Sequence, residues 1–459
     1  MQKGKYMASE EEERGAEEPL SPVSRLLSSP ELCAVIVVTL GLETRCNISS
    51  VVAGIKESLI KLPRFSCKLD MDGKNKKKGE PVWVPVRIQV ESHVVVPDLD
   101  HVKIENPEEY IEDYCSSIVN TPMDMSIPPW EFHVLNLKTS NAESVGIVKL
   151  HHSLGDGMSL MSLLLACSRK TSDPNALPTI AATTKKHQKC TDKGLRFIDT
   201  KNALSSEPMD GIQSRKIIHR IIDFDDVKLV KNIMQMDLDN VMTKGAKCTW
   251  GNFVGLVICP LWIRSEDDPL EYLRQAKATM DRKKLSLEAF NFYGVIKFTM
   301  KLFGEKVVQA ISKRLFDHTT LTYSNVMGPD EEISIFDHPI SYLAASALTG
   351  SQILNIHFVS YVNKLTISLA VDATVIPDPH RLCDDLKDKK IQELTIELRN
   401  EKRYCAAYKE QLDAFAKIVE EHSDRMSKKV ESVVENLKEF EHIELEMLHS
   451  KQDDILSQL

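Results

Sequence analysis

The stretch VGIVKLHHSLGDGMSLMSLLLA, residues 145–166, joins two apolar segments through a pair of histidines and an Asp-Gly pair. The β-branched run before the histidines predicts a buried strand, and the apolar spacing after Gly157 predicts a helix. Alternation along a strand sends His151 and His152 to opposite faces, so only one imidazole can address a given cavity. Gly155 and Gly157 allow a tight turn between the two elements.

A neutral imidazole with an ordinary pKa of about 6.5 can take a proton from an alcohol or thiol and return it to a leaving group, which suits acyl transfer. Asp156 could fix the turn through backbone N–H groups, pair with an arginine or orient the imidazole. One alternative is a pair of structural histidines at a strand end. Another is a metal site of two His and one Asp, which is disfavoured because adjacent histidines diverge on a strand. A Ser-His-Asp triad lacks its G-x-S-x-G element.

The composition indicates a globular protein of several domains: 459 residues, 42% hydrophobic, with a net charge of -9. That charge argues against a general nucleic-acid binder. Ten cysteines without CxxC pairs suggest neither a zinc site nor a disulfide scaffold. The apolar runs at 33–42 and 251–263 are shorter than the roughly 20 residues of a transmembrane helix, so both are predicted to be buried strands.

The order of patterns along the chain predicts an α/β protein with five segments. They are an acidic disordered arm (1–18), a first lobe with the histidine motif (19–180), a polar linker (181–215), a second lobe (216–388) and a helical tail (389–459). The tail has no Pro or Gly, and its apolar residues are spaced by three, four or seven, which predicts a coiled coil. These residues are Leu412, Phe415, Val419, Met426, Val430, Val433, Leu437 and Phe440.

HHSLGDG at 151–157 matches the HHxxxDG motif of the wax ester synthase/diacylglycerol acyltransferase family, and the chain resembles the plant branch of that family. Seven further segments carry the resemblance: EPLSPVSRLLSSP (18–30), LPRFSCKL (62–69), MSLMSLLLACSRKTSDPNALPTI (158–180), KGAKCTWGN (244–252), DPLEYLRQAKATMDRKKLSLEA (268–289), SNVMGP (324–329) and VIPDPHRLCDDL (375–386). The resemblance covers roughly 19–388. The DFGWG motif of the related acyltransferases that modify phenolics is absent.

The resemblance implies a fold like chloramphenicol acetyltransferase, with two lobes around a central channel. It also implies that His152 is the general base that deprotonates a fatty alcohol or a diacylglycerol for attack on an acyl-CoA co-substrate. His151 and Asp156 would shape the catalytic site, no metal or cofactor would be needed, and the protein would lie on the cytosolic face of the endoplasmic reticulum membrane.

Three further residues are candidates for substrate binding. Gly157 permits the tight turn beside the histidines. Asn325, in SNVMGP, could donate a hydrogen bond to the developing oxyanion, an interaction worth about 10²–10³ in rate in other enzymes, or could cap a turn. Arg64 could line the acyl-CoA site or belong to a structural turn.

The chain departs from the family pattern in three places. The polar residues 184–202 replace a membrane-associating apolar stretch, so peripheral contact is expected instead of insertion. After Met236 an Asn-Asp-Val motif, a helix and a strand of the second lobe are missing. The tail resembles nothing in the family. An acyltransferase is the leading hypothesis, and a catalytically impaired scaffold whose tail binds a protein partner or a second copy is the alternative.

Overall fold

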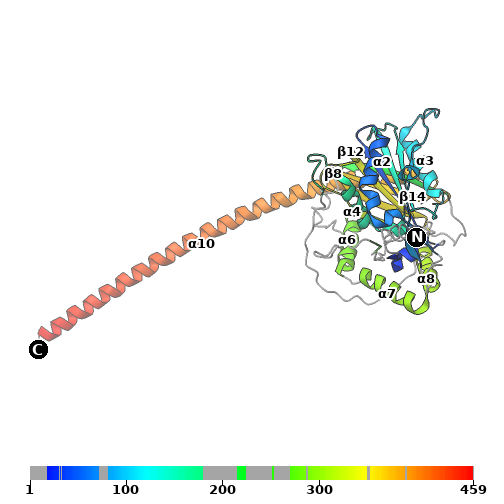
Figure 1. Ribbon diagram of the computed structural model, residues 1–459. Helices are drawn as coiled ribbons and strands as arrows, with labels where there is room; N and C mark the ends of the chain where they lie inside the picture. Colours follow the sequence, from blue (N-terminus) through cyan, green and yellow to red (C-terminus); the bar gives the residue numbers. More distant parts are fainter. Residues whose placement is uncertain are drawn as a thin grey trace, which may run out of the picture. The chain divides into compact units, whose positions relative to one another are not determined.

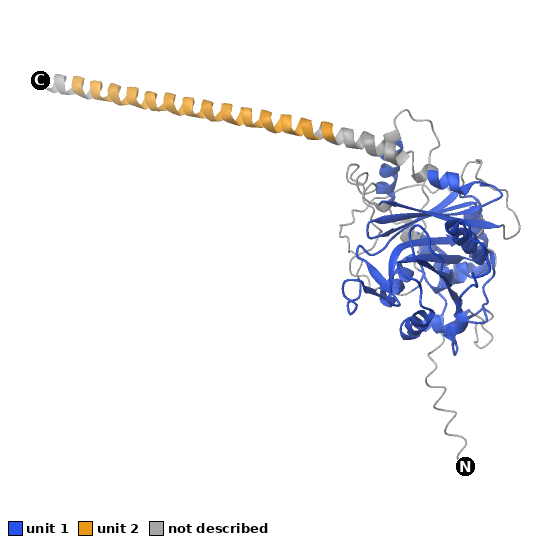
Figure 2. Cartoon of the chain, turned by 90° about the horizontal axis from the view of Figure 1, so that it is seen from above, with its two compact units in different colours: residues 1–392 blue, residues 393–459 orange. Residues whose placement is uncertain are grey.

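The computed structural model describes residues 18–29, 32, 34–71, 81–178, 214–223, 251–252, 269–285, 288–348, 352–387 and 390–457. The chain divides into two compact units, residues 1–392 and 393–459 (Figure 2). Most of the predicted arm and linker, and the segment that follows Met236, lie outside the described residues. So does the predicted strand at 251–263, apart from Gly251 and Asn252, which belong to no strand.

The largest sheet of the described residues has seven strands in the order β5-β6-β7-β2-β12-β11-β8. They are β5 (Val94–Val95), β6 (Trp130–Leu135), β7 (Ser144–His151), β2 (Val35–Leu42), β12 (His338–Leu348), β11 (Ile333–Ile335) and β8 (Ser168–Lys170). Strands β11 and β12 follow the predicted linker in sequence, yet they pair with β8 and β2. The two halves of the sequence therefore share one sheet, so the predicted lobe boundaries at 180 and 216 do not delimit the sheets.

The described residues of the first unit also form two smaller sheets. One has the order β10-β13-β14-β9, from β10 (Leu321–Met327), β13 (Leu354–Tyr361), β14 (Lys364–Asp372) and β9 (Arg215–Asp223). The other has the order β1-β4-β3, from β1 (Glu18–Pro19), β4 (Val82–Pro85) and β3 (Cys67–Asp70). Strand β12 of the large sheet packs against β13 and β14, so the two larger sheets meet there.

The helices of the described residues have the following bounds. They are α1 (Pro22–Leu27), α2 (Ile48–Glu57), α3 (Pro107–Asn120), α4 (Gly157–Cys167), α6 (Pro269–Leu285), α7 (Glu288–Phe303), α8 (Glu305–Asp317), α9 (Pro379–Lys387) and α10 (Lys390–Ser457). The described residues also form four short 3₁₀ helices: η1 (Leu59–Lys61), η2 (Pro63–Ser66), η3 (Val90–His93) and η4 (His152–Leu154). Within the described residues, every helix is too short or too polar to span a bilayer.

The predicted buried strand at 33–42 is confirmed as β2, which is covered on both faces. One face contributes Leu40 and Leu42 to a core that includes the buried indoles of Trp83 and Trp130. On the other face, Val35 and Val37 belong to a second core with α3. Because β2 pairs with β7, this doubly covered strand holds the end of β7 in place.

Candidate active site

The histidine motif lies where β7 ends and η4 begins. His151 is the last residue of β7 and is in register with Val35 of β2. His152 begins η4, and its N–H donates to the carbonyl oxygen of Ala34 at 2.9 Å. The predicted strand, turn and helix are therefore confirmed as β7, η4 and α4.

His151 is buried and its bonds lie within the turn. Its Nδ1 accepts a hydrogen bond from the backbone N–H of Ser153 at 3.2 Å and lies 2.7 Å from Ser153 Oγ. Burial, and then the neighbouring His152, lower the pKa of His151 to about 4. His151 is thus a neutral imidazole that shapes the turn.

His152 is held by Asn252, a residue one hundred positions away. Nδ1 of His152 lies 3.2 Å from Oδ1 of Asn252. Nδ2 of Asn252 donates to the carbonyl oxygen of His152 at 2.7 Å and to Ser24 Oγ at 2.9 Å. These two acceptors fix the orientation of the amide, so Oδ1 accepts from Nδ1–H of His152. Nε2 then carries the lone pair that a general base needs.

The electrostatics keep His152 neutral. Burial lowers its pKa most strongly, while its hydrogen bonds and the charge of Asp156 oppose that shift. The side chain nevertheless keeps part of its surface accessible to solvent. His152 is therefore a neutral, half-buried imidazole.

Asp156 fixes the turn, which is one of the three roles that the sequence leaves open. It is the N-cap of α4, and its Oδ1 accepts from the N–H of Ser159 at 2.9 Å. Its own N–H donates to the carbonyl oxygen of Gly251 at 3.2 Å, and Ser159 Oγ donates to the same oxygen at 2.9 Å. Asp156 thereby ties the histidine turn to the segment that carries Asn252.

Gly157 lies against the four-stranded sheet. A Cβ at this position would lie 3.2 Å from Cγ2 of Val326 in β10, so glycine allows α4 and β10 to approach closely. Asn325 precedes Val326, and strand alternation turns it toward the opposite face, in register with Phe358. The structure therefore brings Gly157 to the histidine turn but turns Asn325 away from α4. Substrate binding by Gly157 and oxyanion binding by Asn325 stay predictions.

Arg64 lies in η2 and its guanidinium is nearly buried. Nη2 lies 2.5 Å from Oε1 of Glu18, and Nε donates to Oε2 of Glu18 at 3.4 Å. This pair ties the short strand β1 to the 62–69 turn, which favours the structural alternative. A role for Arg64 in substrate binding stays a prediction.

His357 is another buried imidazole, and sequence analysis missed it. Its Nε2 accepts from the N–H of Ala347 in β12 at 3.3 Å, so its proton resides on Nδ1. Within the described residues Nδ1 has no hydrogen-bond partner. Burial, and then His152, lower the pKa of His357 to about 4. The spacing of Asn355 and His357, two residues apart on one face of β13, was the available signal.

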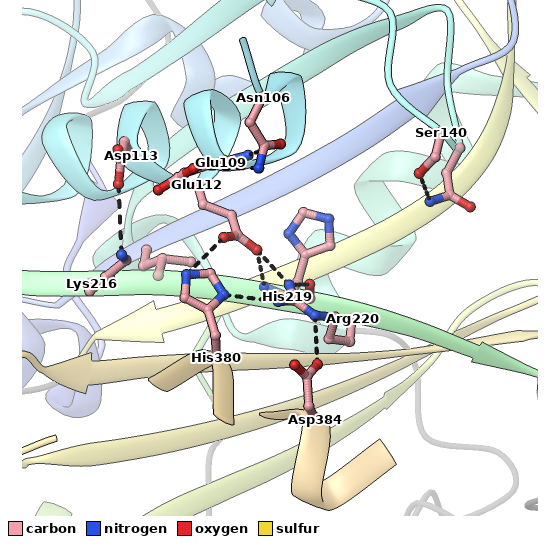
Figure 3. Close-up of polar contacts among 12 residues, drawn as sticks. Asn106, Glu109, Glu112, Asp113, Ser140, Lys216, His219, Arg220, His380 and Asp384 are labelled. Atoms are coloured by element: carbon pink, nitrogen blue, oxygen red, sulfur yellow. Dashed lines mark hydrogen bonds and ion pairs between the residues drawn. The ribbon is translucent and has the colours of Figure 1, made fainter. Parts of the chain in front are cut away.

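A separate polar cluster joins α3, β9 and α9 (Figure 3). Glu112 Oε1 lies 2.9 Å from Nη1 of Arg220, and Glu112 Oε2 lies 3.5 Å from Nε2 of His380. Nε of Arg220 also lies 3.1 Å from Asp384 Oδ1. Burial raises the pKa of Glu112 against the opposing pull of Arg220 and His380. A cavity of about 470 Å³ borders the cluster. Because these charged side chains pair with one another, the cluster has a structural role.

The described part of the chain holds no group of three His, Cys, Asp or Glu side chains that could bind a metal ion. The metal-site alternative for His151, His152 and Asp156 therefore gains no support from these residues.

Comparison with solved structures defines the class of fold. The wax ester synthase/diacylglycerol acyltransferase from Marinobacter aquaeolei VT8 superposes with a TM-score of 0.54 at 15% identity, over 83% of this chain and 99% of that chain. The first condensation domain of the calcium-dependent antibiotic synthetase superposes with a TM-score of 0.50 at 11% identity, over 84% of this chain and 97% of that chain. The chain thus has the two-lobed acyltransferase fold that the sequence predicts.

Sequence comparison gives the family. Residues 32–225 match the wax ester synthase/diacylglycerol acyltransferase catalytic domain, and residues 250–394 match the WS/DGAT C-terminal domain. Wax ester synthase/diacylglycerol acyltransferase 3 of Arabidopsis thaliana is 53% identical over 468 aligned positions, which cover 84% of this chain and 95% of the relative. The chain belongs to the wax ester synthase/diacylglycerol acyltransferase family.

The same alignment bears on the predicted deletion. Because 84% of 459 residues is about 386, fewer than the 468 aligned positions, the relative carries residues that this chain lacks. An internal deletion, as predicted after Met236, has this effect.

Proposed function

We propose that the protein is an acyl-CoA-dependent O-acyltransferase that esterifies a long-chain alcohol or a diacylglycerol with a fatty acyl group. The observation that carries the proposal is His152: a neutral, partly accessible imidazole whose Nδ1–H is held by Asn252. The membership of the family supports the choice of substrates.

The chemistry follows from this geometry. Nε2 of His152 removes the proton of the acceptor hydroxyl while the oxygen attacks the carbonyl carbon of the acyl thioester. A tetrahedral oxyanion forms and collapses, and the C–S bond breaks. The imidazolium returns its proton to the departing CoA sulfur, so the products are an ester and free CoA. No acyl-enzyme is needed.

A transfer assay identifies the acceptor. Purified protein is given labelled palmitoyl-CoA with either hexadecanol or diacylglycerol, and the lipid products are separated. Wax ester or triacylglycerol, formed with stoichiometric CoA release, is the expected result. A folded protein that forms neither ester would favour the scaffold alternative, which the 53% identity to a wax ester synthase/diacylglycerol acyltransferase currently disfavours.

We further propose that the protein acts at the cytosolic face of the endoplasmic reticulum membrane through peripheral contact. The apolar acceptors and products support this location, because such lipids reside in membranes. Fractionation of cells that express the full chain tests it: recovery with reticulum membranes, and release by alkaline carbonate, is expected. Recovery in the soluble fraction alone contradicts it.

For α10 we propose pairing with a second copy of the chain. The eight coiled-coil residues named above are all exposed along a helix of 68 residues. In a parallel coiled coil, the positions beside the apolar seam of one helix face those of the other helix. Here Asn436 would face Glu441 and Ile443 would face Leu448, so neither pair brings two like charges together. Light scattering should give a dimer or larger assembly for the parent and a monomer for Leu437→Lys. A parent that is monomeric at micromolar concentration rules out the pairing.

A further inference from the structure

Helices α7 and α8 form a hairpin at the periphery of the first unit (Figure 1). Gly304, with a φ of +82°, occupies the turn between them, a conformation that favours glycine. Ile296 of α7 and Val308 of α8 are buried against Leu26 and Leu32. This packing fixes which face of each helix points outward.

The outward face carries large apolar side chains. On α7, Val295, Phe298 and Leu302 follow the i, i+3, i+7 spacing of one helical face, and their exposed fractions are 60%, 62% and 57%. Phe303, at the end of α7, is 65% exposed, and Ile311 of α8 is 58% exposed. Grouped exposed apolar side chains, unlike scattered ones, mark interaction surfaces.

Basic side chains border these apolar residues. Lys297 and Lys301 of α7 and Lys306 and Arg314 of α8 are all exposed. The acidic groups nearby have partners of their own: Glu305 accepts from Gln309 at 3.0 Å, and Asp317 pairs with Lys313 at 2.8 Å. An apolar stripe with cationic edges is the pattern of helices that lie in the interface of an anionic membrane.

The hairpin is also connected to the histidine turn. Helix α1 packs against η4, which begins with His152, and against both α7 and α8. A membrane that contacts the hairpin would therefore be separated from the histidine turn by α1 alone among the helices that join them. Two copies meeting through the same face would oppose lysine to lysine, which disfavours self-association there.

We infer that the outward face of the α7–α8 hairpin docks on an anionic lipid surface, with Phe298, Leu302 and Phe303 entering the acyl region and the basic residues contacting headgroups. This face is the lipid-docking surface. The inference rests on the proposed function, since it gives that function a route to membrane-borne acceptors.

Co-sedimentation of the full chain with vesicles tests the inference. One vesicle preparation is pure phosphatidylcholine and the other contains phosphatidylserine in addition. The parent should bind the mixed vesicles, and Phe298→Ser/Leu302→Ser should bind about tenfold more weakly. Lys297→Glu/Lys301→Glu should lose the preference for phosphatidylserine. Val96→Ser, an exposed apolar side chain outside the hairpin, is the matched control and should bind like the parent.

Equal binding by the parent and the Phe298→Ser/Leu302→Ser variant would overturn the inference, whether the vesicles are held by α10 or by another surface. A parent that binds neither vesicle would also overturn it. A second assay, with decanol and decanoyl-CoA in detergent micelles, separates this outcome from failure of the proposed function. The docking variants should retain the parental rate there, whereas a protein that is no acyltransferase makes no ester in any variant.

Discussion

At the scale of single residues, Asn252 opposes the effect of burial on the pKa of His152. Its Oδ1 accepts from the ring, and this bond raises the pKa of His152 against the lowering effect of burial. Asn252 acts through His152 and is therefore a positioning residue. Its contribution should be visible in the pH dependence of the reaction.

Two replacements of Asn252 should shift the pKa of His152 in opposite directions. Asn252→Leu removes the acceptor, so the pKa of His152 should fall further and kcat should drop by about 10²-fold as the ring loses its orientation. Asn252→Asp places a carboxylate beside Nδ1–H, so the pKa of His152 and the acid limb of kcat/KM should move to higher pH. The measurement is kcat/KM from pH 5 to pH 9. If kcat/KM depended on pH in both variants as it does in the parent, Asn252 would not position His152.

At the scale of elements, the contact between β10 and β13 explains why the SNVMGP segment carries a glycine at position 328. Its N–H donates to the carbonyl oxygen of Ser360 at 3.0 Å, and a Cβ would lie 2.2 Å from that same oxygen. Gly328→Ala should therefore shift the end of β10 away from β13 and cost about 1–3 kcal/mol of unfolding free energy.

Gly294, inside α7, has open space around it, so Gly294→Ala should raise the free energy of unfolding by about 0.5–1 kcal/mol. Urea unfolding measures both, and equal effects would contradict the assigned contacts.

Glu112 connects three elements through the cluster in Figure 3. Glu112→Ala would remove the buried carboxylate that pairs with Arg220 and His380, while Arg220 would keep its ion pair with Asp384, so a loss of about 1–3 kcal/mol is expected. Lys56 and Glu91 form an exposed pair, and Glu91→Ala should change stability by less than about 1 kcal/mol. Chemical denaturation distinguishes the two. A small effect at Glu112 would mean that water already solvates the cluster.

At the scale of the whole molecule, three imidazoles link stability to pH: those of His151 and His357 are buried, and that of His219 is half-buried. Burial lowers the pKa values of His151, His219 and His357 to about 4. Between pH 6.5 and 4 the unfolded chain therefore binds more protons than the folded chain, so stability falls as the pH falls, by on the order of 1 kcal/mol per pH unit for each histidine. Tm measured from pH 7 to pH 4.5 should decline, and less steeply in His219→Phe, which keeps a ring against Tyr342. A steeper decline in that variant would contradict this explanation.

How far the sequence predicts the molecule depends on the range of the interactions. The strand at 35–42, the histidine turn and α4 follow from local periodicity and from glycine and Asp-cap chemistry, and all three are confirmed. The contacts of Asn252 with His152 and of Arg64 with Glu18 join distant positions, and a single sequence does not encode such pairings in any local pattern. The position of β12 in the first sheet escaped prediction for the same reason.

Asn325 illustrates a related limit. The segment SNVMGP identifies the family, but the face to which Asn325 points depends on the register of β10 with β13. A slip of one residue would reverse that face. The alternation of a short strand does not reveal which of its faces meets the histidine turn, so the sequence alone could not place Asn325 relative to that turn.

The central claim is that His152 is the base of an acyl transfer. Its most direct test is the rate of ester formation from palmitoyl-CoA and the accepted alcohol by the parent, by His152→Ala and by His151→Ala, with Tm as a check on folding. We predict that His152→Ala keeps a Tm close to the parental value and loses about 10²–10⁴ in kcat. We expect His151→Ala to lose stability as well as activity. Parental turnover by a folded His152→Ala protein would contradict the account.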